Sequence, residues 1–297
     1  MAAAQNLTVV RMFAFPVLEG FNLQTSAGKY NEKAAKGLDY VIAAAARRGL
    51  KLVVALANNW KYNDKNTDAK CAYTNWTRTA HGCDDFWTDQ NAIKLYKKNS
   101  EVITGRVNTL TGVAYKEDPT ILAWNLINEP RCETPGCAPR MQAWIEDVSA
   151  HLKSVDPNHL ITVGEDGFYQ ADNCWSDIAN PVPRNGYKNQ GAPGSGWPLA
   201  TGQDFVPNHA PAAIDFLSIH MWPGEFLFQE REGEGEGGEG WGWGWRAGGG
   251  RRAKRDRATK EGWWPPTATH LNKNLKTSSL SAALSHAPPP LFFFTYL

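Results

Sequence analysis

The sequence predicts an α/β protein built around a parallel β-barrel. Short apolar runs that read as buried strands alternate along the chain with longer amphipathic segments that read as helices. The apolar runs end in polar and aromatic residues, as strands do where a parallel sheet carries a site. The 297 residues also suffice for a single-domain α/β barrel, which needs about 250 residues. Repeated strand–helix units of this kind favour a parallel barrel over a β-sandwich.

Each predicted element follows from its local pattern. The Ala-rich helix at residues 31–48 ends at Gly49, because glycine readily takes the left-handed conformation that stops a helix. A long polar loop is expected between residues 58 and 88, and a loop rich in Gly, Pro and Asn before residue 214. The remaining helices are predicted at residues 89–107 and 140–154, and the strands at 7–14, 50–57, 121–127, 160–163 and 214–219.

The most informative stretch is the run at residues 121–127, which stops at Asn128-Glu129-Pro130. Pro130 cannot donate a hydrogen bond to a sheet and disfavours helix at Glu129, so the strand must end there. An amide and a carboxylic acid are thereby fixed at the carboxyl end of a buried strand, where α/β enzymes keep their chemistry. A strand-terminating turn with a solvated acid is the alternative interpretation.

Four of the five cysteines fall in two locally spaced pairs, Cys71 with Cys83 and Cys132 with Cys137, and Cys174 is left over. Pairs of this spacing in loop-like sequence predict two disulfides and an oxidising compartment. Zinc binding is the alternative, although no histidine stands at ligand spacing near either pair. Asn75-Trp76-Thr77 is a glycosylation sequon in the same region and favours secretion.

The net charge of +1 argues against a protein-wide field for nucleic acid or membrane surfaces. No apolar run reaches the roughly 20 residues of a transmembrane helix, and no signal peptide precedes the first predicted strand. We therefore expect a monomer without nucleic-acid or membrane partners, and no cofactor or metal.

Five segments, in the same order, resemble the endo-β-1,4-mannanases of glycoside hydrolase family 5. They are Val-Arg-Met-Phe-Ala-Phe at 10–15, Val-Val-Ala-Leu-Ala-Asn-Asn-Trp at 53–60, residues 106–132 with Asn-Glu-Pro-Arg-Cys, Thr-Val-Gly-Glu-Asp-Gly-Phe-Tyr at 162–169, and Phe-Leu-Ser-Ile-His-Met-Trp-Pro at 216–223. The resemblance covers roughly residues 7–223. It implies a secreted (β/α)8 barrel, here with about its second to sixth strands, that hydrolyses β-1,4-mannosidic bonds with retention of configuration.

The resemblance also implies the roles of individual residues. Glu129 matches the acid/base, whose pKa burial would raise, and Asn128 matches the neighbour that binds the sugar 2-hydroxyl. Arg11 stands where the family orients its nucleophile. The other implied substrate-binding residues are Asn59, Trp60, His220 and Trp222. The two tryptophans are candidate sugar platforms, although at Trp222 the family more often carries a tyrosine that hydrogen-bonds the nucleophile. Glu165 and Asp166 are expected near the cleft without a catalytic role.

The resemblance ends at Pro223, before the strand on which the family carries its nucleophile. Glu225 follows His220 too closely for an intervening helix, so we do not assign it that role. Residues 224–297 read as a low-complexity, disordered tail of intron-derived sequence that follows a partial barrel domain at 1–223. We expect the chain to lack activity because the nucleophile is missing. A non-catalytic mannan-binding remnant, a cellulase-type β-1,4-glucanase and a tail that binds nucleic acid are the alternatives.

Overall fold

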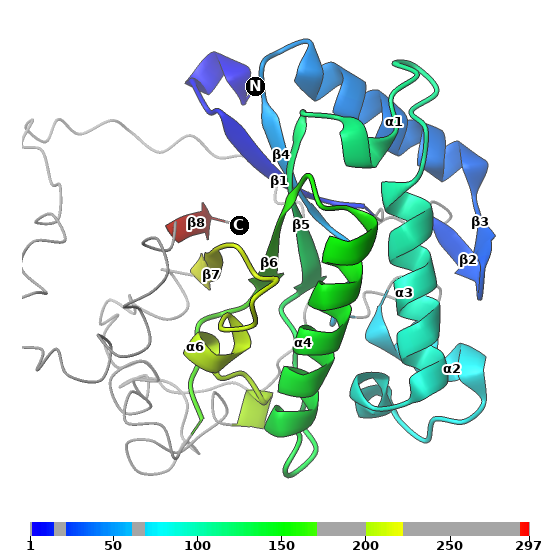
Figure 1. The fold of residues 1–297 in the computed structure, drawn as a ribbon, viewed down its shortest axis with the longest axis vertical. Helices are drawn as coiled ribbons and strands as arrows, with labels where there is room; N and C mark the ends of the chain where they lie inside the picture. Colours follow the sequence, from blue (N-terminus) through cyan, green and yellow to red (C-terminus); the bar gives the residue numbers. More distant parts are fainter. Residues whose placement is uncertain (1, 15–21, 61–68, 171–199, 222–291, 297) are drawn as a thin grey trace, which may run out of the picture. The chain divides into compact units, whose positions relative to one another are not determined.

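The computed structural model describes residues 2–14, 22–60, 69–170, 200–221 and 292–296 (Figure 1). Contacts divide the chain into two units, Met1–Gln229 with Pro290–Leu297 and Glu230–Pro289. All described residues belong to the first unit, which alone is considered below.

A parallel sheet forms the centre of this unit. Its strands are β1 (Val9–Phe13), β4 (Lys51–Ala55), β5 (Ile121–Asn128) and β6 (Leu160–Gly164), in that order across the sheet. β7 (Leu217–Met221) lies beyond β6, since Ile219 bridges Glu165 and the His220 N–H donates to the Glu165 carbonyl at 2.7 Å. Parallel strands placed in chain order confirm the predicted parallel α/β architecture. A closed or partial eight-stranded barrel stays a prediction.

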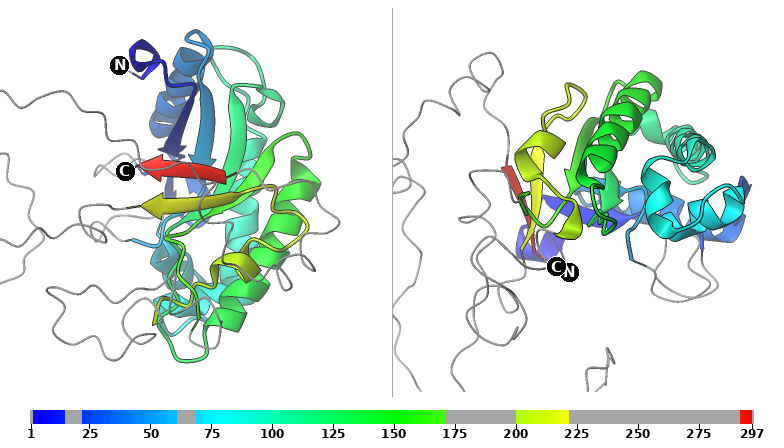
Figure 2. Two further views of the ribbon diagram at one scale, coloured as in Figure 1. Left: turned by 90° about the vertical axis from the view of Figure 1, so that its left-hand side faces the viewer. Right: turned by 90° about the horizontal axis from the view of Figure 1, so that it is seen from below.

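Helices α1 (Glu32–Ala46), α3 (Gln90–Thr104) and α4 (Ala138–Val155) pack along one side of the sheet (Figures 1 and 2). The Asn31 side chain caps α1 by accepting from two backbone N–H groups, and the Asp89 side chain caps α3 through Ala92. Gly49 follows α1 with a φ of +66°, as its predicted role as a helix stop requires. All three predicted helices are confirmed, with ends shifted by a few residues.

Alternating side chains place apolar residues on both faces of the sheet. On β4, Leu52 and Val54 belong to the large core between the sheet and the helices. Val53, between them, joins Ala123 and Phe216 in a smaller cluster. Strands buried on both faces are typical of parallel sheets covered by helices.

The segment between the two cysteines of the first pair differs from the predicted polar loop. It contains α2 (Lys70–Thr77), and η2 (Cys83–Trp87) begins at the second cysteine. Tyr73 of α2 packs on Phe86 of η2 at 5.5 Å between ring centroids, and both side chains are fully buried. The prediction of a polar loop was wrong here, because aromatic contacts with η2 stabilise α2 and its own sequence shows no helical periodicity.

Both predicted disulfides are confirmed. Cys71 pairs with Cys83 at a Cα–Cα distance of 4.4 Å, and Cys132 pairs with Cys137 at 5.5 Å. Cys174 lies outside the described residues. The other described elements are short: η1 (Ala3–Gln5), β2 (Gln24–Ser26), β3 (Lys29–Tyr30), η3 (Tyr115–Glu117) and α6 (Phe205–Asn208).

Two features in the second half of the chain differ from the sequence-based prediction: the start of β7 and a strand in the tail. β7 begins at Leu217 and not at residue 214, because the Asp215 carboxylate is held by the Ile161 N–H and by Lys153, which places residues 214–216 in the approach to the strand. The tail was expected to lack structure, but β8 (Phe292–Tyr296) pairs in parallel with β7. Aromatic residues favour strands, and β7 offers an unpaired edge to them. The rest of the tail, residues 224–291 and 297, lies outside the described residues.

Candidate active site

The carboxyl ends of β4, β5, β6 and β7 bring the predicted site residues to one edge of the sheet. Glu129 follows β5, and its N–H donates to the Gly164 carbonyl at the end of β6, at 2.6 Å. Glu129 has a φ of +49°, the left-handed region that residues with side chains rarely adopt. Pro130 disfavours the right-handed helical conformation at this position. Strain of this kind persists where the surroundings hold the backbone firmly, and it is common at active sites.

Two donors from distant strand ends hold the Glu129 carboxylate. The Trp60 indole Nε1 donates to Oε2 at 2.5 Å, and His220 Nδ1 contacts Oε1 at 2.9 Å. Glu129 is 6% exposed, whereas Trp60 is 38% exposed. The acid is therefore nearly enclosed, and the open side of the site is the side on which Trp60 lies.

The expectation of a raised Glu129 pKa is wrong for the net shift, although burial itself acts in that direction. Burial does act upward, but the hydrogen bond and charge of His220, the Trp60 N–H and the charge of Arg131 together hold the pKa below its usual value. Burial lowers the pKa of His220, with the charge of Arg11 acting in the same direction. The contact with Glu129 acts in the opposite direction on His220, so each group of the pair favours the charged form of the other.

Arg11 lies on β1 and reaches two amides of β5. Its Nη2 donates to Asn125 Oδ1 at 2.6 Å and to Asn128 Oδ1 at 2.8 Å. Asn128 Nδ2 in turn donates to Asn58 Oδ1 at 3.0 Å. The amide of Asn128 is thus fixed from both sides, which orients its remaining N–H.

Arg131 extends the site on the other side of Glu129. Its Nη2 pairs with Asp166 Oδ2 at 2.8 Å, and its guanidinium carbon lies 5.5 Å from the Trp60 ring centroid and 5.4 Å from that of Phe168. Burial raises the pKa of Asp166 to about 6, although Arg131 acts against it. Arg131 therefore links the exposed tryptophan to a buried acid and adds positive charge near Glu129.

A second ion pair fixes the backbone that follows Glu129. Lys70 Nζ donates to Asp84 Oδ1 at 2.6 Å and to the Arg131 carbonyl at 2.5 Å. Asp84 Oδ2 accepts from the backbone N–H groups of Glu133 and Thr134 and from the Thr134 hydroxyl, at 2.8–2.9 Å. We call the Lys70–Asp84 ion pair, with its contacts to residues 131, 133 and 134, the clamp. Because Lys70 adjoins Cys71 and Asp84 adjoins Cys83, the first disulfide holds the two residues of the clamp close together.

The structure places five of the proposed site residues close together: Arg11, Trp60, Asn128, Glu129 and His220. Asn59 is buried at the same edge, and its N–H donates to the Asn128 carbonyl at 3.0 Å. Trp222 lies outside the described residues.

Sequence reasoning missed Asn125, Arg131 and the pair of Lys70 with Asp84. Asn125 interrupts an apolar run, and Arg131 directly follows Pro130, so both positions could have been noticed. Lys70 and Asp84 stand in polar sequence that gives no local indication of burial.

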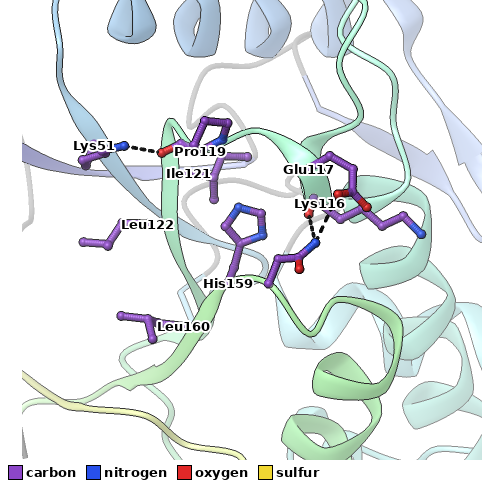
Figure 3. A pocket seen from close by; sticks show the side chains of 9 residues that line it. Lys51, Lys116, Glu117, Pro119, Ile121, Leu122, His159 and Leu160 are labelled. Carbon is purple, nitrogen blue, oxygen red and sulfur yellow. Dashed lines mark hydrogen bonds between the residues drawn. The ribbon is translucent and has the colours of Figure 1, made fainter.

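Neither of two further features is part of this site. Among the described residues, one group of potential metal ligands was found, Asp84 with Cys132 and Cys137, but both cysteines are bonded to each other. A cavity of about 370 Å³ lies at the amino ends of β4, β5 and β6, the opposite edge from Glu129 (Figure 3). His159 lines it, but both ring nitrogens already contact Asp156 and Asp118.

A nearly enclosed carboxylate, held by aromatic and imidazole donors at the carboxyl edge of a parallel α/β sheet, is typical of the α/β-barrel class of enzymes. The described residues include no helix long and apolar enough to span a membrane.

Comparison with known proteins narrows this class to a family. The family described as GH family 5 β-mannosidase-like matches residues 14–178. Mannan endo-1,4-β-mannosidase 4 of Oryza sativa subsp. japonica is 39% identical over 231 residues, which cover 76% of this chain and 46% of the relative. Mannan endo-1,4-β-mannosidase 7 of Arabidopsis thaliana is 37% identical, with coverage of 76% and 48%. The chain thus spans about half the length of these curated relatives.

A solved mannanase structure supports the same family. The endo-β-1,4-mannanase from Thermotoga petrophila superposes with a TM-score of 0.60 at 30% identity, over 76% of this chain and 48% of that one. The chain belongs to glycoside hydrolase family 5, among its β-mannosidase-like members.

Proposed function

We propose that this chain carries the acid/base half of a retaining endo-glycosidase that hydrolyses β-1,4-mannosidic linkages. The observation that supports the proposal most directly is the Glu129 carboxylate, held by Trp60 and His220 at the carboxyl edge of the sheet. The relatives named above as mannan endo-1,4-β-mannosidases give the substrate class. The proposed substrate is therefore a β-mannan.

In this mechanism Glu129 protonates the departing glycosidic oxygen and later removes a proton from the attacking water. Asn128 keeps one N–H on Nδ2 beyond the one bound to Asn58, and this N–H would bind the sugar 2-hydroxyl. Trp60 is partly exposed and would stack its ring against one face of a sugar unit. Its indole N–H would at the same time orient the Glu129 carboxyl group.

Retention requires a second carboxylate about 5–5.5 Å from the first. We assign this nucleophile to no residue of the present sequence and expect it on a further strand of the family's barrel. Its negative charge would raise the pKa of Glu129, which in the described structure is held low. The two carboxylates together would then keep the acid protonated. Without that nucleophile the 297-residue chain should show no mannanase activity.

An extracellular location fits the two disulfides, because such bonds persist in oxidising compartments. A monomer is proposed without a structural observation behind it. Residues 224–297 are proposed to be a low-complexity tail of intron origin.

A chimera tests the function. Residues 7–221 are placed between the flanking segments of the rice relative, and sugar release is measured on mannan and on cellulose. Mannan hydrolysis that Glu129→Gln abolishes is the expected result, together with azide rescue of Glu129→Ala on activated aryl mannosides. Near-normal activity of Glu129→Gln on mannan would show that Glu129 is not the acid/base. Cleavage of cellulose in preference to mannan would replace the proposed substrate by a β-1,4-glucan.

A further inference from the structure

The sequon Asn75-Trp76-Thr77 lies in α2, where the structure gives it a defined orientation. Asn75 is exposed, whereas Tyr73 and Thr74 beside it are buried. Trp76 is half-buried and packs edge-on against Tyr73 at 5.5 Å between ring centroids. Within the described part of the chain, the Asn75 side chain makes no hydrogen bond and is open to solvent.

The orientation of α2 separates Asn75 from the candidate active site. Lys70 faces the loop that follows Glu129, through its hydrogen bond to the Arg131 carbonyl. Asn75 comes five residues later, which at 3.6 residues per turn places it about 140° around the helix. A bulky group on Asn75 would therefore project away from the site edge.

The same geometry places Asn75 next to a disulfide. Cys71 precedes Asn75 by four residues, and residues four apart on a helix are neighbours, with about 5–6 Å between their Cβ atoms. Cys71 is half-buried and its partner Cys83 is exposed, so solvent reaches this disulfide. Cys132 and Cys137 are each only 2% exposed. The two disulfides thus differ in accessibility, and Asn75 stands beside the accessible one.

We propose that Asn75 carries an N-linked glycan that covers the Cys71–Cys83 disulfide. This inference rests on the extracellular location proposed above and not on the hydrolytic activity. The donor is an oligosaccharide carried on a lipid diphosphate. Asn75 Nδ2 forms a bond to its anomeric carbon, the bond from that carbon to the diphosphate oxygen breaks, the lipid diphosphate leaves, and the amide nitrogen loses a proton. Thr77 supplies the hydroxyl that the sequon requires.

The glycan would protect the bond on which the clamp of Lys70 and Asp84 depends. Disulfides are reduced when a thiolate attacks one sulfur, so the rate depends on access to the bond. A glycan one helical turn from Cys71 would obstruct that approach. The structure thereby connects a surface modification to the backbone that follows Glu129.

Glycan occupancy at Asn75 is tested by adding a secretion leader to the full chain and expressing it through the secretory pathway of a eukaryotic cell. Peptides from the secreted and the retained protein are mapped by mass before and after treatment with an N-glycan amidase, which converts a glycosylated Asn to Asp. We expect this conversion at Asn75 in the chain and in Thr77→Ser, and not in Thr77→Ala. The second sequon, Asn6-Leu7-Thr8, gives a separate peptide and is read separately. An unmodified Asn75 peptide in chains whose Cys71–Cys83 disulfide has formed would overturn the proposal, whatever the outcome for mannan hydrolysis.

Shielding is tested by the reduction rate of each disulfide under a dilute dithiol. Glycosylated chain is compared with chain treated by the amidase, and alkylation followed by mass mapping reports each cysteine. We expect removal of the glycan to speed reduction of Cys71–Cys83 severalfold and to leave Cys132–Cys137 unchanged. Equal rates with and without the glycan would refute the covering role.

Discussion

Lys70→Met should weaken the fold through one buried ion pair. The Lys70 side chain is 7% exposed and that of Asp84 18% exposed, and burial lowers the pKa of Lys70 while Asp84 opposes this. The substitution keeps a long apolar side chain beside the Trp87 ring, which Lys70 Nζ approaches to 5.5 Å. It removes the charge and the hydrogen bond to the Arg131 carbonyl. The main change is thus the loss of the ion pair and not of packing.

The expected loss of unfolding free energy follows from the Asp84 charge, which stays buried without Lys70. Removing one partner of a buried pair costs about 3–5 kcal/mol, because the other charge stays buried without compensation. Asp84 still accepts three hydrogen bonds from residues 133 and 134 and is partly exposed, so we expect the lower end. A loss of about 3 kcal/mol would leave a domain of ordinary stability folded, since such domains have about 5–15 kcal/mol.

Urea unfolding followed by tryptophan fluorescence measures this loss as a shift in midpoint at unchanged slope. The matched control is Lys97→Met, which breaks an exposed pair with Asp147, whose side chain is 51% exposed. The control should lose less than about 1 kcal/mol. Combining Lys70→Met with Asp84→Asn should cost less than the sum of the single changes, because the two residues interact. Equal losses for Lys70→Met and Lys97→Met would refute the buried clamp.

Three further substitutions test the site. Gly164→Ala should cost about 1–3 kcal/mol in urea unfolding, because an added Cβ would lie 2.6 Å from the Asn125 amide oxygen that Arg11 binds. Gly37→Ala, in open space on α1, is its control and should not destabilise. Trp60→Phe should raise the pKa of Glu129, because a hydrogen bond to the charged carboxylate is lost. Carbon-13 NMR of the carboxyls measures this, and Trp76→Phe should leave the pKa unchanged. Glu165 is fully buried, and burial raises its pKa to about 8 from 4.5. Between pH 4.5 and 8 the unfolded chain loses this proton and the folded chain keeps it, so folding stability falls as pH rises. Glu165→Gln should flatten that fall in unfolding midpoints, and an unchanged pH profile would contradict the raised pKa.

The sequence by itself determined the elements that local rules control. The helix starts near residues 31 and 89, the stop at Gly49 and the end of β5 before Pro130 each depend on a few neighbouring residues. The two disulfides were predictable for the same reason, since each pair is separated by no more than 12 positions. The family motifs then indicated which strand ends would meet.

Only the tertiary structure decided the contacts that join distant parts of the chain. Arg11 and Asn125 are 114 positions apart, and Glu129 and His220 are 91 positions apart. The direction of the Glu129 pKa depends on these partners, so the sequence could suggest burial but not the balance of donors against it. The helix at Lys70–Thr77 was missed likewise, because aromatic contacts with η2 stabilise it where its own polar sequence predicts a loop. Caps, turns and nearby disulfides depend on residues close in the sequence. Burial and charge at this site depend instead on which distant strands the fold brings together.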